Sequence, residues 1–229
     1  MKLLLLFFSC ALATIIYSIP SFANDSVKKI LPAPRTEGGM PLMQALRERQ
    51  SARSFSDHDL SDQMLSDLLW ATFGINRPDS GKRTAPSARN WQEVDVYVVT
   101  KNHSYVYDPN SHSLKFVANG DLRALTGRQE FAATAPLNFV FVADISKMTG
   151  VSADNIDLYI GADVGFVSQN VYLFCASEGL ATVARASLDR IPLGKALNLT
   201  EHQRIVLAQT IGYPAGYTPK AIRTEVNIP

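Results

Sequence analysis

Apolar residues recur along the chain with two spacings, and each spacing predicts a type of element. The helical spacing predicts helices over residues 42–49, 61–73, 122–132, 156–178 and 192–197. Alternating or continuous apolar runs predict strands over residues 93–100, 137–143, 180–184 and 204–212, and a hairpin over residues 105–117. Helices that alternate irregularly with the strands of a mixed sheet predict an α+β domain.

The ends of two predicted helices carry recognisable caps. Ser61 is the predicted N-cap of the second helix, and Gly74 follows its last apolar residue. The helix over residues 156–178 is the longest, and Gly179 is placed to end it. Apolar residues occupy nearly all of its sides, with small residues among them. Such a helix is usually buried on several sides, so we expect it at the centre of the fold or of a dimer.

Two stretches lack any periodic pattern. Residues 24–41 contain prolines and glycines and predict an extended lead-in before a single domain over residues 42–229. Residues 76–90 are polar, rich in turn-forming residues and include Lys82, Arg83 and Arg89. An irregular stretch of this length inside a compact domain is more often functional than idle.

Residues 1–23 are typical of a signal peptide rather than of the fold. Lys2 provides a positive start, an apolar run follows, and small residues at Ser21 and Ala23 suit a signal peptidase. Cleavage after Ala23 would place the mature chain in the periplasm or outside the cell, with no stable membrane insertion. The alternative is an uncleaved anchor, because a membrane span needs about 20 apolar residues and this run is close to that length.

Composition narrows the classes of function. A chain of 229 residues predicts one domain, alone or with appendages, and a net charge of +1 offers no basic face for nucleic acid. Signal cleavage leaves Cys175 as the single cysteine, so no internal disulfide forms, and its apolar surroundings indicate a core thiol rather than a nucleophile. The four histidines are scattered, which does not suggest a metal site. No serine nucleophile elbow or glycine-rich phosphate loop is present.

Two arginines flank a serine at alternate positions in Arg49-Gln50-Ser51-Ala52-Arg53, which we call the arginine run. In an extended segment Arg49, Ser51 and Arg53 would point the same way. Guanidinium groups bind phosphate and planar electron-rich groups bidentately, so the run is a candidate site for such a ligand. The alternative is a solvated helix end that leads into a loop. Further candidate groups are Ser87, Asn90, Lys220 and Arg223.

Four segments in order resemble the signatures of the nitroreductase superfamily. They are the arginine run, Pro86-Ser87-Ala88-Arg89-Asn90-Trp91-Gln92, the segment from Glu178 to Val183 followed by Leu188-Asp189, and Gly212-Tyr213-Pro214 with a basic tail. The match extends over about residues 42–228. Residues 68–76 and the Tyr107-Asp108-Pro109 hairpin resemble the SagB/ThcOx-like branch.

The resemblance implies a three-layer fold, a mixed and mainly antiparallel sheet flanked by helices, and a homodimer with FMN at its interface. Carried over by position, Arg49, Gln50 and Ser51 would lie near the phosphate and ribityl chain of FMN, and Arg53 near the pyrimidine edge of the ring. Ser87 and Asn90 would contact the flavin from the neighbouring subunit. Backbone N–H groups at Ala186 and Ser187 would face the hydride-accepting nitrogen. Lys220 or Arg223 would close on the phosphate.

The chain also departs from the pattern of this family. Ala186 and Ser187 stand where many relatives have glycine, and Arg128 stands where asparagine is expected. The Lys-Tyr pair of azoline-oxidising relatives has no match, which argues against that reaction. The function implied is an exported FMN-dependent oxidoreductase that takes electrons from a small-molecule donor and reduces a nitro compound, quinone or similar acceptor by ping-pong hydride transfer. The alternatives are a flavin- or small-ligand-binding module without turnover, and a scaffold that only dimerises.

Overall fold

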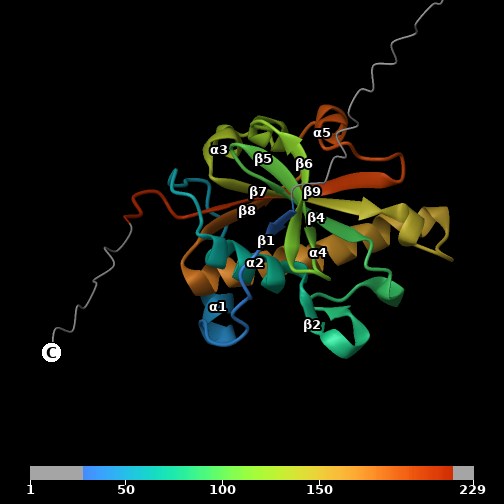
Figure 1. Cartoon of the computed structure of the whole chain (residues 1–229), viewed down its shortest axis with the longest axis horizontal. Coiled ribbons are helices and arrows are strands. Elements are labelled where there is room, and N and C mark those ends of the chain that lie inside the picture. Colours follow the sequence, from blue (N-terminus) through green and yellow to red (C-terminus); the bar gives the residue numbers. More distant parts are fainter. Residues whose placement is uncertain (1–27, 219–229) are drawn as a thin grey trace, which may run out of the picture.

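The computed structural model describes residues 28–218, and a seven-stranded sheet forms its centre (Figure 1). The strands lie in the order β1-β6-β5-β4-β7-β9-β8, and every pairing between them is antiparallel. Their bounds are β1 Lys28–Ile30, β4 Val94–Val99, β5 His103–Asp108, β6 Ser113–Asn119, β7 Leu137–Asp144, β8 Ala181–Arg185 and β9 Gln203–Gly212. The prediction of an α+β fold with a mainly antiparallel sheet is confirmed.

Helices cover both faces of this sheet and make three layers. They are α1 Leu42–Glu48, α2 Asp62–Phe73, α3 Glu130–Thr134, α4 Ala153–Glu178 and α5 Arg190–Ala196. Because side chains alternate along a strand, Val96 of β4 belongs to the core beneath α2 and α4, whereas Tyr97 belongs to the core beneath α5. Phe139 and Val140 of β7 divide between the two cores in the same way. The alternation of side chains along the strands therefore gives the sheet two apolar faces, and helices pack on each of them.

The predicted helix over residues 122–132 is wrong. The chain forms the 3-10 turn η3 Arg123–Thr126, becomes extended at Gly127, and then enters α3. The buried side chain of Arg185 lies against Gly127 and would collide with a Cβ atom there. Arg185 also donates a hydrogen bond to the carbonyl of Thr126. A side chain from β8, remote in sequence, thus interrupts the helix.

Both irregular stretches contain strands that the sequence did not reveal. Residues 28–30 form β1 and pair with β6 at the edge of the sheet. Residues 75–90 contain a small antiparallel pair, β2 Ile75–Arg77 and β3 Lys82–Arg83, together with the 3-10 turns η1 Pro78–Ser80 and η2 Ala88–Asn90. These strands have two or three residues, which is too short for an apolar period to appear.

The long helix α4 is not covered on all sides. Its buried face, which includes Val164, Val167 and Val171, lies against the sheet, but Leu158 and Phe166 are 67% and 48% exposed. Gly161 and Gly165 lie on the same open side, and a Cβ atom at either would meet nothing within 4 Å. We call these residues the α4 stripe. A single chain leaves it in contact with water.

The predicted helix caps are present. The Oγ atom of Ser61 accepts a hydrogen bond from the backbone N–H of Met64, and Gly179 ends α4 with a positive φ of 69°. No helix among residues 28–218 is both long and apolar enough to cross a membrane. The predicted signal peptide over residues 1–23, Lys220 and Arg223 lie outside the described residues.

Candidate functional site

The arginine run leaves α1 at Arg49 and lies along β8, the strand at one edge of the sheet. The backbone N–H of Ala52 donates to the carbonyl oxygen of Thr182 at 2.9 Å, and Phe55 forms a β-bridge with Pro214. The run is therefore held on the folded domain and is not simply a solvated helix end. Edge strands have unpaired backbone groups, and the run satisfies part of that edge.

Tyr172 of α4 is the point to which the run is attached. Its hydroxyl lies 2.9 Å from the Oγ atom of Ser51 and accepts a hydrogen bond from the N–H of Ala184 at 2.9 Å. The guanidinium of Arg49 lies over the tyrosine ring, 5.2 Å from its centroid. Arg49 and Ser51 thus share a side of the run, as the extended alternation predicted. Arg53, which the same prediction placed with them, is exposed and makes no side-chain contact with Tyr172 among the described contacts. Tyr172 could not be recognised from the sequence, where it occupies one more apolar position of the predicted helix.

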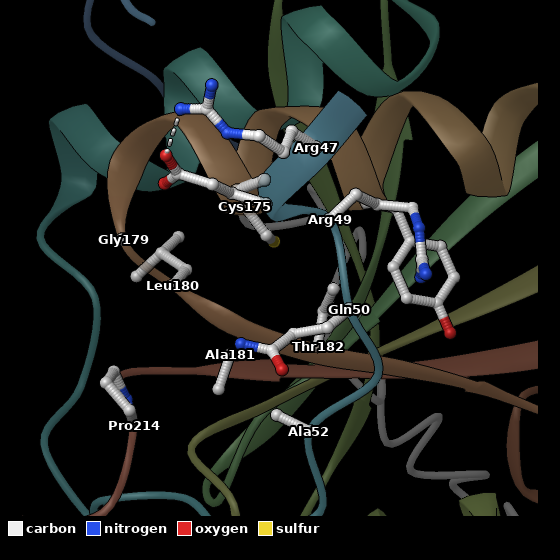
Figure 2. Close-up of a pocket in the computed structure, with 13 residues that line it drawn as sticks. Arg47, Arg49, Gln50, Ala52, Cys175, Gly179, Leu180, Ala181, Thr182 and Pro214 are labelled. Atoms are coloured by element: carbon white, nitrogen blue, oxygen red, sulfur yellow. Dashed lines mark hydrogen bonds and ion pairs between the residues drawn. The ribbon is translucent and has the colours of Figure 1, made fainter. Parts of the chain in front are cut away.

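A cavity of about 460 Å³ lies between the arginine run, the end of α4 and β8. Figure 2 shows the amide of Gln50 reaching into it toward Ala181, while the guanidinium of Arg49 turns aside. Gly179, Leu180 and Pro214 complete the wall on the far side. The volume is in the range of small-molecule and cofactor sites, about 300–1,000 Å³. Its polar side chains at one end are the amide of Gln50, the guanidiniums of Arg47 and Arg49, and the carboxylate of Glu48, which pairs with Arg47 at 3.4 Å. Two cations and one anion leave a net positive charge, which suits an anionic ligand.

Cys175 lies in the wall of this cavity but is fully buried. Burial raises the pKa of its thiol far above the usual range, since a thiolate would lose its hydration there. The prediction of a core thiol is confirmed. Within residues 28–218, no three His, Cys, Asp or Glu side chains form a group that could hold a metal ion.

Ser87 and Asn90 lie at a different place, on the N-terminal half of α4. The N–H of Ala88 donates to the Oδ2 atom of Asp163 at 2.9 Å. Asp163 and Tyr172 are nine residues apart on α4, which corresponds to about 14 Å along a helix. One chain therefore does not bring Ser87 and Asn90 to the cavity beside the arginine run.

Ala186 and Ser187 follow β8 directly and are exposed. The carbonyl of Ala186 accepts from the N–H of Leu188, and that of Ser187 accepts from the N–H of Arg128 at 3.0 Å. Both are thus in a turn that is tied to the segment after η3. The structure places this turn at the end of the strand that forms one wall of the cavity.

Next to this turn is Arg185, a buried cation that the sequence did not single out. Its guanidinium donates to the side-chain oxygens of Asn138 and Thr210, both at 2.7 Å, and no carboxylate accompanies it among the described contacts. Desolvation lowers its pKa to about 10. The only signal in the sequence would have been a charged residue at an inward position of a short strand.

Two buried carboxyl groups were also missed. Glu93 is 0% exposed and Asp163 is 3% exposed. Burial, together with the neighbouring Asp163, raises the pKa of Glu93 to about 7. Each acid accepts one hydrogen bond from the turn that contains Ser87 and Asn90.

Comparison with known proteins agrees with the architecture. The model of the nitroreductase family matches residues 46–213. A protein of Methanocaldococcus jannaschii is 29% identical over 176 residues, which is 72% of this chain and 88% of its own length. A crystal structure from Ralstonia eutropha JMP134 is 40% identical, with 83% of this chain and 90% of that chain covered and a TM-score of 0.79. Both carry the description "putative nitroreductase".

A more distant structure shows the fold alone. The NADPH:FMN oxidoreductase of Vibrio harveyi, solved with NAD+, has a TM-score of 0.56 at 20% identity, with 78% of this chain and 72% of that chain covered. The resemblance found in the sequence is confirmed at the level of the family, while the SagB/ThcOx-like branch stays a prediction.

Proposed function

The chain belongs to the nitroreductase family, and we propose that it is an exported FMN-dependent oxidoreductase whose site is completed by a second copy of the chain. Oxidoreductase activity follows from the family. FMN, the dimer, the location and the acceptor are the parts that we propose.

The residues around the cavity fit FMN. The guanidinium of Arg49 would turn from the Tyr172 ring to hold its phosphate, with Ser51 beside it, and Gln50 already reaches into the cavity. Arg53 would stabilise negative charge on the pyrimidine side of the ring. When bound, FMN accepts a hydride from one small molecule and passes it to another. The protein positions the cofactor and tunes it, which accounts for a site without an acid–base motif.

The proposal of a dimer is supported by the distance along α4 between two candidate parts of the site. The arginine run and the turn with Asn90 lie about 14 Å apart on one helix. The α4 stripe begins before Asp163 and continues between the two contact points, and it exposes Leu158 and Phe166 to water. Its glycines allow a second backbone to approach closely. A second copy packed on this stripe would cover the apolar surface and bring its own Asn90 toward the cavity.

The acceptor we propose is a small conjugated molecule such as a nitro compound or a quinone, reduced by ping-pong hydride transfer. The predicted signal peptide supports action in the periplasm or outside the cell, with an electron donor available there. Fractionation of cells followed by mass determination of the N-terminus tests this location. Recovery of an uncleaved chain in the membrane would support the anchor instead.

Purified mature protein provides the main test. We expect residues 24–229 to bind FMN, and the complex to be a dimer in sedimentation. Arg49→Ala should weaken FMN binding about tenfold, which corresponds to about 1.4 kcal/mol. Arg204→Ala is the matched control, because Arg204 lies on the surface and pairs with Asp157.

The possible results separate the candidates. FMN that is bleached by a reductant and restored by a quinone or nitro compound supports the oxidoreductase. Bound FMN without turnover for any donor and acceptor pair selects the binding module. A colourless protein that cannot be loaded with FMN rejects the proposal.

A further inference from the structure

The segment from Ser87 to Gln92, which we call the Ser87 turn, has an unusual backbone. Arg89, Asn90 and Gln92 have positive φ angles of 50°, 57° and 50°. Residues other than glycine adopt this region rarely, and each instance is retained only when surrounding contacts determine it. Three such residues within four positions need a strong local anchor.

Two buried acids supply that anchor. The Oγ atom of Ser87 donates to the Oε2 atom of Glu93 at 2.9 Å and accepts from the N–H of Gln92 at 2.8 Å. The N–H of Ala88 donates to the Oδ2 atom of Asp163 at 2.9 Å. The start of the turn is thus held both by Glu93, directly before β4, and by Asp163 of α4.

Glu93 and Asp163 accept hydrogen bonds from the adjacent residues Ser87 and Ala88, so their buried carboxyl groups are close neighbours. The Oε1 atom of Glu93 is buried and has no hydrogen-bond partner among residues 28–218. Two adjacent carboxylates in a dry site repel each other, and a single proton between them removes the repulsion and gives Oε1 its partner.

No cation compensates the pair among the described residues. The basic groups on the neighbouring segments are engaged elsewhere: Lys147 contacts Asp95 and the carbonyl of Gln92, Arg89 donates to the carbonyl of Gly150, and Arg83 donates to Gln92 and the carbonyl of Phe73. From β7, Asp144 presents only its backbone N–H to the Glu93 carbonyl, while its own carboxylate accepts from Ser146. A proton is therefore the available means of neutralising one charge.

We propose that Glu93 and Asp163 share one proton and act as positioning residues that fix the Ser87 turn, so that Asn90 is presented to the cofactor bound by the partner subunit. This inference rests on the proposed function for the role of Asn90. It also changes the expected role of Ser87, because the hydroxyl hydrogen of Ser87 is committed to Glu93. The side chain of Asn90 is exposed, with its Oδ1 atom held by Gln92 at 3.1 Å and its amide nitrogen available.

Because the two acids share a proton, the stability of the Ser87 turn depends on pH. Folding raises the pKa of Glu93 from 4.5 to about 7, so the folded protein binds more protons than the unfolded chain between these values. The contribution of this group to stability is complete below pH 4.5 and is lost as the pH rises through about 7. Above that range the second charge should loosen the turn and weaken FMN binding.

The test compares Glu93→Gln with wild type, first without FMN. Wild-type stability in urea should decrease between pH 5 and 8, and in Glu93→Gln this decrease should disappear. Glu201→Gln, a change of an acid that is 87% exposed, should keep the wild-type profile. Infrared spectra at pH 6 should show a protonated carboxylic acid band that is lost in Glu93→Gln. Coinciding pH profiles for wild type and Glu93→Gln would overturn the inference.

The second measurement is FMN affinity. Wild type should bind FMN at least threefold more weakly at pH 8.5 than at pH 6, and Asn90→Ala should bind more weakly at both. Affinity that is independent of pH in wild type contradicts the positioning role. Complete absence of FMN binding rejects the proposed function, while the stability profiles still decide whether the proton is shared. If Glu93→Gln does not fold, the pH profile of Asp163→Asn in urea and the infrared band of the wild type decide whether the proton is shared.

Discussion

Replacing Tyr172 with phenylalanine tests how the arginine run is held in place. The substitution removes one hydroxyl and keeps the ring, so the contact between the Arg49 guanidinium and the ring at 5.2 Å can persist. What is lost are two hydrogen bonds, one with Ser51 and one from the N–H of Ala184, both of 2.9 Å. The perturbation therefore separates the hydroxyl from the cation–π contact.

The expected loss of stability follows from the hydrogen bonds that each group loses. A typical hydrogen bond contributes about 1 kcal/mol net, and a buried donor left without a partner costs about 1–3 kcal/mol. Tyr172 and Ala184 are half-buried, so water can replace part of the loss. We expect the free energy of unfolding to fall by about 1–2 kcal/mol. FMN affinity should fall about fivefold, which corresponds to about 1 kcal/mol, because the run is no longer aligned before binding.

Urea unfolding followed by circular dichroism measures the stability, and quenching of FMN fluorescence measures the affinity. Ser51→Ala and the double variant complete a cycle, in which we expect a coupling of about 0.5–1 kcal/mol between the two hydroxyls. Ser146→Ala serves as a control, since Ser146 is exposed and bonds only to Asp144 within its own turn. The reasoning is refuted if Tyr172→Phe matches wild type in both assays, or if the two hydroxyls show no coupling.

Three further outcomes are expected. Gly127→Ala should reduce the free energy of unfolding by about 3 kcal/mol in urea, because the buried guanidinium of Arg185 must leave its partners; a loss below about 1 kcal/mol would contradict this. Arg53→Ala should lower the reduction potential of bound FMN by about 30 mV with little change in melting temperature, and an unchanged potential in a redox titration rules out the assigned role. Cys175 should resist thiol reagents until denaturant is added, and rapid labelling of folded protein would show otherwise.

Much of the fold was predictable because local patterns and tertiary structure agree. The alternation over residues 93–100 placed Val96 and Tyr97 on opposite faces of the sheet, and both cores are found there. Ser61 and Gly179 predicted helix ends because caps act within a few residues. The failure at residues 122–132 has the opposite cause, since Arg185 interrupts the pattern from a distant strand.

The candidate site was predictable only in part, for a related reason. The arginine run was recognisable from its alternation of charge and hydroxyl, and the structure places Arg49 and Gln50 on a cavity. Tyr172 gave no signal, since a tyrosine on a long apolar helix matters here only through what its hydroxyl reaches. Glu93 and Asp163 likewise gain their meaning from meeting each other in the interior.

The attachment of Ala52 to Thr182 also determines when the pocket can exist. These two residues are separated by roughly 130 positions, and the bridge from Phe55 reaches still further, to Pro214. Contacts of such long range form late, because much of the chain must be ordered before they close. A nascent polypeptide therefore has nowhere to bind a cofactor until almost all of it has been synthesised. Fragments that stop before β9 should have no binding site at all, so loading with flavin reports completion of the chain.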